Sequence, residues 1–161
     1  MEEREESWHP HLLGFLLPII TIAGIYQGGW WCFAGFVYAL GLCPLIDLVS
    51  PKSSPKRSNS SSTPWNGLLV AHAFFMYSAI GVLIWRANLD GFGSSVILGG
   101  LSVGVVSGIS GIINAHEAGH RRKGSFMWRV ARLNLLLVLY LHFTTEHNHG
   151  HHRHYATVKD P

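Results

Sequence analysis

Charged residues are scarce in this chain of 161 residues. Lys and Arg number 12 and Asp and Glu number 9, which makes 13% of the sequence, while 48% is hydrophobic. Long stretches without any charge are not expected of a soluble domain of this length. Together with 18 glycines, they indicate helices packed inside a bilayer. The net charge of +3 is small and arises from short clusters between apolar runs, so no nucleic-acid partner is predicted.

Cysteine is equally scarce, since Cys32 and Cys43 are the only two. They lie in one apolar segment, they do not form a CxxC site, and a helix would hold them too far apart for a disulfide. We therefore interpret both as packing residues. The N-terminus is acidic and lacks the basic region and cleavage site of a secretory signal, so the first apolar segment is expected to stay in the mature protein.

The remaining pattern predicts an all-α integral membrane protein with about four transmembrane helices. A helical hairpin is expected over 12–48, a Ser/Pro-rich loop over 50–64 and a second helical pair over 65–113. The last of these helices carries small residues four apart on one face, which predicts close approach of another helix. These residues are Gly100, Gly104 and Gly108.

A fifth segment, over 126–145, is too short in its apolar part and too charged at Arg129 and Arg132 to predict a span. We expect an interfacial or re-entrant helix that returns the chain to the same membrane face. The positive-inside bias places the N-terminus, the loop over 50–64 and the region 114–161 in the cytoplasm. The basic residues that support this orientation are Arg4, Lys52, Lys56, Arg57, Arg121, Arg122 and Lys123.

Histidines gather in two boxes within the region 114–161. His116 and His120 are four residues apart, as are His147 and His151, so each pair would share one helical face. His152 could reach a second ion. Imidazole suits iron, zinc, copper and nickel, and five such ligands exceed the need of one zinc ion. Two metal ions are therefore predicted, and the two other histidines of this segment, His149 and His154, are expected not to be ligands.

Other ionisable residues allow more than one interpretation. Asp47 either marks a membrane boundary, fixes a helix end or accepts a hydrogen bond from a ligand histidine. His142, one turn before Glu146, is expected to support the ligands without binding metal. Glu117 would be the general base if the HExxH pattern belonged to a membrane zinc protease. A lone His72 inside an apolar helix is either a hydrogen-bonded packing residue or a functional group.

Three motifs closely resemble the membrane alkane 1-monooxygenases (AlkB-type alkane hydroxylases) of the histidine-box desaturase and hydroxylase superfamily. They are NAHEAGHR over 114–121, HFxxEHNxGHH over 142–152 and ATxxDP over 156–161. The segment PLID over 44–47 also fits this family, whereas Val158 stands where the family usually has proline. The resemblance extends over nearly the whole chain, from the first hairpin to Pro161.

This resemblance implies a six-helix membrane enzyme with a non-haem di-iron centre on the cytoplasmic side. Such an enzyme hydroxylates the terminal carbon of an alkane or fatty-acyl chain with O2 and electrons from a rubredoxin-type donor. The ligands that it implies are His116, His120, His147, His151 and His152, with Glu117, His142, Glu146 and Asp47 as supporting groups.

The family's third histidine box is not found in this sequence. We therefore expect residues 1–161 to be the N-terminal part of a single hydroxylase domain with an incomplete set of iron ligands. A bacterial inner membrane and an endoplasmic reticulum both fit this expectation. The alternatives are a fatty-acid desaturase or hydroxylase of the same superfamily, a membrane zinc protease, an inactive truncated fragment, or a histidine-rich surface that binds metal without catalysis.

Overall fold

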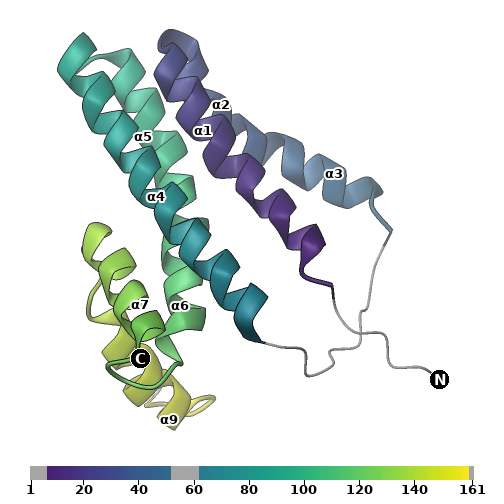
Figure 1. Ribbon diagram of the computed structural model, residues 1–161, viewed down its shortest axis with the longest axis vertical. Coiled ribbons are helices and arrows are strands. Elements are labelled where there is room, and N and C mark those ends of the chain that lie inside the picture. Colours follow the sequence, from purple (N-terminus) through teal and green to yellow (C-terminus); the bar gives the residue numbers. More distant parts are fainter. Residues whose placement is uncertain (1–6, 52–61, 160–161) are drawn as a thin grey trace.

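The computed structural model describes residues 7–51 and 62–159, and all regular elements in those ranges are helices (Figure 1). Four helical stretches are long and apolar enough to cross a membrane, namely His9–Gln27, Gly29–Val49, Thr63–Asp90 and Ser94–Gly119. The predicted all-α membrane fold with four spans is thus confirmed. Three of the basic residues used to predict the loop orientation (Lys52, Lys56, Arg57), together with Arg4, Asp160 and Pro161, lie outside the described residues.

The first two spans form the predicted hairpin. The first consists of η1 (His9–Phe15) and α1 (Leu16–Gln27), and the second of η2 (Gly29–Phe33), α2 (Ala34–Val37), η3 (Tyr38–Leu42) and α3 (Cys43–Val49). Between them, Gly28 and Gly29 have φ of 84° and 57°, a backbone conformation that residues with a Cβ rarely adopt. The two glycines therefore allow the chain to reverse directly after α1.

The third and fourth spans also form a pair, and the fourth continues into the first histidine box. α4 (Ser62–Asp90) is followed by a turn at Gly91 and by α5 (Ser94–Val106). The π-helical segment η4 (Ser107–Ile113) then leads directly into α6 (Asn114–Gly119). The first box thus lies on the end of a spanning helix, as expected from the apolar run that leads into it.

The core of the spanning bundle lies between α1, α4 and α5, where Ile25, Met76, Ala79 and Val106 are fully buried. Small residues permit the closest contacts. A Cβ on Gly24 would overlap the carbonyl oxygen of Trp31, which is why the two arms of the hairpin can lie so close together.

The predicted close approach at Gly100, Gly104 and Gly108 is not found in the described part of the chain. A Cβ on any of these three glycines would meet no atom within 4 Å. On the same helix the close contacts are made by Gly99, which faces Leu83, and by Gly111, which faces Met76. The repeat of small residues was correctly read as a feature of one helical face, but the neighbouring helices pack on a different face.

A short helix separates the two boxes, as predicted. α7 (Phe126–Leu137) is capped at its N-terminus by Ser125, whose hydroxyl accepts a hydrogen bond from Trp128 N at 3.3 Å. Its 12 residues reach roughly 18 Å, too little to cross the hydrocarbon layer. It packs along α6 and also touches α4 (Figure 1). The chain then continues through α8 (Phe143–Thr145), η5 (Glu146–His151) and α9 (His152–His154).

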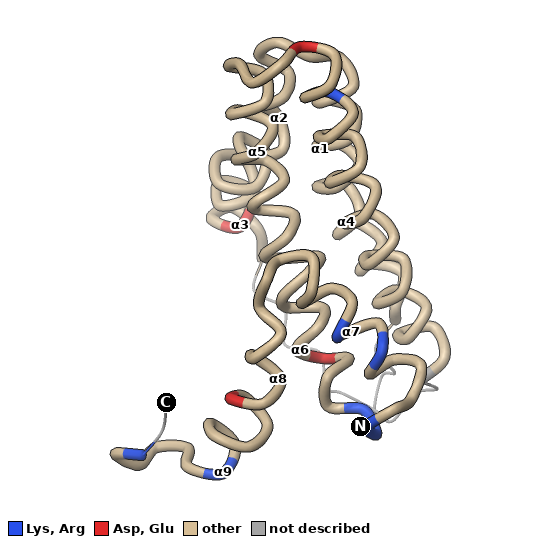
Figure 2. The backbone as a smooth tube through the Cα atoms, turned by 90° about the vertical axis from the view of Figure 1, so that its left-hand side faces the viewer, with Lys and Arg blue, Asp and Glu red and all other residues tan. Residues whose placement is uncertain are grey.

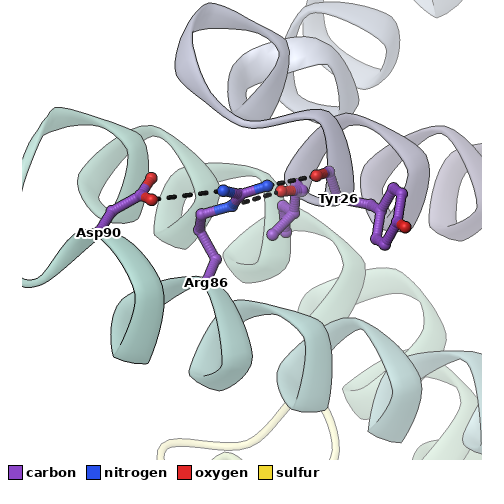
Figure 3. A network of polar contacts seen from close by, with 4 residues as sticks. Tyr26, Arg86 and Asp90 are labelled. Carbon is purple, nitrogen blue, oxygen red and sulfur yellow. Dashed lines mark hydrogen bonds and ion pairs between the residues drawn. The ribbon is translucent and has the colours of Figure 1, made fainter.

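Charged residues occupy the ends of the bundle and α3, and the middle of the long helices carries none (Figure 2). Among residues 7–51 and 62–159, Arg86 is the cation at the end opposite to the histidine boxes. Its guanidinium donates to the backbone carbonyl oxygens of Ile25, at 2.9 Å, and Tyr26, and its Nη1 lies 3.3 Å from Asp90 (Figure 3). Carbonyl groups at the end of a helix lack intrahelical partners, so Arg86 caps α1 from the neighbouring helix.

Replacing Gly24 by alanine is predicted to destabilise the bundle, because the new methyl group would overlap the backbone of Trp31. The matched variant Gly104→Ala meets open space, and alanine is favoured over glycine in a helix by about 1 kcal/mol. The midpoint of thermal unfolding in detergent micelles should fall in Gly24→Ala and stay equal or rise in Gly104→Ala. Equal midpoints in the two variants would contradict the packing described here.

Arg86→Ala is predicted to lower the free energy of unfolding by about 1.5–3 kcal/mol, the usual contribution of a hydrogen bond to a charged group. The side chain of Arg86 is 11% exposed, so solvent cannot replace its lost contacts fully. Chemical unfolding in micelles, with the exposed Arg122→Ala variant as the control, measures this difference. A loss no larger than that of the control would show that α1 is not held by this cap.

Candidate metal centre

The helix α6 presents the first histidine pair at the end of the fourth span. His116 and His120 lie one turn apart, with ring centroids separated by 5.0 Å. The opposite face of α6 carries Ala115 and Ala118, which are buried against α7. Packing through these small residues turns the two imidazoles away from α7, so that their nitrogens remain available.

The second box returns to the first. The ring of His147 lies 4.2 Å from that of His116 and 5.3 Å from that of His120, measured between centroids. One nitrogen from each of these three residues lies within 4.8 Å of the other two. The structure therefore brings together residues that are about thirty positions apart, and the predicted return of the chain through a short helix is confirmed.

His152 and His151 adjoin this trio. The Nε2 atoms of His152 and His147 are 3.0 Å apart, and the His152 ring lies 5.0 Å from that of His120. His151 stacks on His147 at 5.5 Å between ring centroids, and its ring makes a T-shaped contact with that of Tyr155 at 5.3 Å. All five histidines that were predicted as ligands thus lie in one cluster, here called the histidine cluster.

The π-helical form of η5 was not expected. The sequence suggested that His147 and His151 would pair through α-helical spacing. A π turn contains one more residue than an α turn, so a residue lies closest to the one five positions later instead of four. The ring of His152 is accordingly nearer to His147, at 4.4 Å, than the ring of His151 is.

Three residues that hold the second box in place were not predicted as parts of the site. The ring of Phe143 stacks on that of His147, with 5.0 Å between centroids. Asn148 Nδ2 donates to the backbone carbonyl oxygen of Gly119 at 3.3 Å, which ties η5 to α6. Arg132 Nη1 donates to the carbonyl oxygen of Leu141 at 2.8 Å and fixes the connection after α7. Phe143 and Asn148 belong to the quoted motif, but spacing alone gave them no role.

The other predicted residues lie at different distances from the histidine cluster. Glu117 is exposed on α6, next to His116. His142 Nε2 and Glu146 Oε2 are 3.9 Å apart, an ion pair when the imidazole is protonated. Asp47 is exposed on α3, which lies apart from α6 and α9 in Figure 1, so the structure does not bring it to the cluster.

The two histidines predicted not to be ligands belong to the same segment. His149 is exposed on η5, and His154 is half-buried at the end of α9. Neither belongs to the group of three nitrogens that could share an ion.

The donor set suits a transition metal. Nitrogen ligands lie about 2.0–2.1 Å from a metal such as zinc, so nitrogens that share an ion are roughly 3 to 4 Å apart. Separations up to 4.8 Å in the trio need only small side-chain rotations to reach this range. Burial, and after it the repulsion from the neighbouring His116, His152, His120 and His151, together lower the pKa of His147 from 6.5 to about 4. The imidazole of His147 is therefore neutral at pH 7, as a ligand must be.

Comparison with curated proteins gives several relatives of this chain. The chain is 33% identical to alkane 1-monooxygenase 1 of Alcanivorax borkumensis over 165 residues, which covers 95% of this chain and 40% of that protein. It is 29% identical to the alkane 1-monooxygenase of Pseudomonas putida and 30% identical to that of Ectopseudomonas oleovorans. In both cases the match covers 100% of this chain and 42% of the relative.

No family model and no solved structure matches the chain. The chain spans about two fifths of the length of the relatives that it matches. The matches nevertheless cover both histidine boxes and all four spans, because they extend over 95% of this chain or more. In sequence, over nearly its whole length, the chain resembles the membrane alkane 1-monooxygenases.

Proposed function

We propose that this chain forms part of a non-haem di-iron monooxygenase that hydroxylates the terminal carbon of alkanes or related lipid chains. The observation that carries the proposal is the convergence of His116, His120 and His147 at one end of four membrane-spanning helices. The similarity to several alkane 1-monooxygenases supports the same chemistry. In this proposal residues 1–161 form the N-terminal part of a single hydroxylase domain, which is supported by the contacts of α6, the carrier of the first histidine pair, with η4 and α4.

The iron ligands from this chain would be the five members of the histidine cluster. His116, His120 and His147 are close enough to share one ion, and His152 and His151 adjoin them as ligands for a second. Iron bound there would supply the one-electron chemistry that activates O2 for attack on a C–H bond. Because five imidazoles are few for two octahedral ions, further ligands are expected from outside these residues.

The protein's own residues have three tasks in this proposal. Asn148 and Phe143 hold His147 in the orientation that faces α6. Glu117 and Glu146, each adjacent in sequence to a histidine of the cluster, would add negative charge that attracts a metal cation, and His142 lies 3.9 Å from Glu146. The apolar spans exclude water, and an alkane partitions into the bilayer beside them.

We also propose that the histidine cluster faces the cytoplasm, where a rubredoxin-type donor could deliver electrons. The described cations at the cluster's end of the bundle include Arg121, Arg122, Lys123, Arg129 and Arg132, whereas Arg86 lies at the other end (Figure 2). This asymmetry fits the positive-inside bias. It suits a bacterial inner membrane and an endoplasmic reticulum equally.

His120→Ala is predicted to abolish iron binding at the trio and, with it, formation of the terminal alcohol. Membranes that contain the protein are supplied with O2, octane, a reductase and rubredoxin, and the products are identified by mass spectrometry. Iron is quantified on the purified protein. The matched control is His149→Ala, which removes an exposed imidazole of the second box that lies outside the trio. It should keep both iron content and product.

The products and the metal distinguish the alternatives. A double bond in place of the alcohol would favour a desaturase, and one zinc ion without iron would favour a protease with Glu117 as its base. Iron and alcohol that persist in His120→Ala would contradict the proposed ligand.

The lowered pKa of His147 predicts how the stability of the metal-free protein depends on pH. Its pKa is about 4 when folded and 6.5 when unfolded, so the unfolded state binds more protons between these values. Stability should therefore decrease as pH falls from 6.5 to 4, with no further loss from this group at lower pH. Unfolding midpoints between pH 7.5 and 4 measure the slope.

His147→Asn should have a shallower pH dependence than the wild type, and His149→Asn should keep the wild-type slope. The difference in slope between the wild type and His147→Asn should correspond to at most about one proton taken up on unfolding. The same slope in His147→Asn and the wild type would show that the imidazole of His147 is not held neutral.

A further inference from the structure

The π-helical segment η4 lies directly before the first histidine pair. It covers Ser107–Ile113, and α6 begins at Asn114. A π turn contains one residue more than an α turn, and π segments are frequent at functional sites. Since each helical residue turns the chain by about 100°, the extra residue rotates everything that follows by that angle. The direction in which His116 and His120 point therefore depends on the persistence of this π turn.

One face of α4 contacts this segment at three positions. Asn114 Nδ2 donates to the carbonyl oxygen of Leu69 at 2.7 Å, and the His72 Nδ1 and Ser110 Oγ atoms are 3.0 Å apart. Farther along, a Cβ on Gly111 would lie 2.6 Å from the sulfur of Met76. Positions 69, 72 and 76 share one helical face, so α4 meets η4 and the start of α6 along a continuous line. We call these contacts the α4–η4 seam.

The polar groups of the seam are removed from water. Ser110 is fully buried, Asn114 is 5% exposed, and His72 is half-buried with Phe15 against its ring at 4.4 Å. A π segment can relax into an α-helix when one residue shifts its register. That shift would rotate Ser110 and Asn114 away from α4 and leave their polar groups without partners in an apolar region. It would also move Gly111 away from Met76, whose sulfur lies 2.6 Å from where a Cβ on Gly111 would stand.

We propose that His72 and Asn114 are positioning residues that lock the π-helical register of η4 and thereby aim His116 and His120 at His147. His72 acts through Ser110 and does not belong to the group of nitrogens that could share an ion. The lone intramembrane histidine thus acquires a role at the metal centre without touching it. The functional consequence rests on the proposed metal centre, whereas the register itself does not depend on metal.

The register can be measured without metal by cysteine labelling. In a background with Cys32→Ala and Cys43→Ala, the exposed Glu117→Cys should react rapidly with a maleimide, and the buried Ala118→Cys should react slowly. His72→Leu, or Ser110→Ala as the smaller change, should raise the labelling rate of Ala118→Cys severalfold. His72→Asn keeps a polar atom near the position of Nδ1 and should restore protection. The matched control is Phe74→Leu, on the exposed face of α4, which should change nothing.

The consequence for the centre is measured by titrating the purified protein in micelles with Co²⁺, whose visible spectrum reports ligand geometry. His72→Leu should weaken binding about tenfold and alter the spectrum, as loss of a group that orients ligands typically does. Combining His72→Leu with Ser110→Ala should add little to either change, because both remove the same bond.

The two measurements distinguish the possible failures. Unchanged labelling and an unchanged Co²⁺ spectrum in His72→Leu and Ser110→Ala would overturn the seam while leaving the metal centre intact. A wild-type protein that binds no Co²⁺, but whose labelling depends on His72 as described, would overturn the centre and support the seam. Equal effects of His72→Asn and His72→Leu would overturn the role of the hydrogen bond.

Discussion

Hydrocarbon cannot solvate polar groups, and the arrangement of this protein follows from that constraint. The backbone of each span forms its hydrogen bonds within a helix, and several polar side chains inside the bundle join two segments. Ser102 donates to the carbonyl oxygen of Cys32 at 2.7 Å and accepts from the backbone N–H of Phe36, so it holds α5 to the second span. Arg86 and His72 connect α4 to α1 and to η4 in the same way. Ser102, Arg86 and His72 thus connect neighbouring helical segments by hydrogen bonds.

The same constraint confines the chemistry to one end of the bundle. Imidazoles are best solvated where the spans meet water, and the fourth span continues into α6, which carries the first histidine pair at that end. The short helix α7 then keeps the second box at this end. It can pack closely on α6 because Ala115, Ala118 and Ala131 leave little between the two backbones. The histidine cluster therefore depends on the interface between α6 and α7, which is formed by small apolar residues.

Two of the π-helical segments adjoin the histidines, one before the first box and one within the second. A π turn alters the rotation of all that follows it, so it can change which side chains meet without changing the path of the helix. In η5 it favours the pairing of His147 with His152, and in η4 it aims the first pair. A wide turn is less favourable than an α turn, so neighbouring contacts must hold it. In η4 these are the contacts of Leu69, His72 and Met76.

The sequence by itself determined the four spans, the short helix between the boxes and the five histidines. Hydropathy, charge and residue spacing are properties of residue order, and the bilayer acts on them directly. Only the tertiary structure decided which surfaces meet. It placed close packing at Gly99 and Gly111 instead of Gly100, Gly104 and Gly108, and it left Asp47 away from the histidine cluster. It also paired His72 with Ser110 across 38 positions. Such contacts depend on the rotation of one helix against another, which a single extra residue in a turn can change by about 100°.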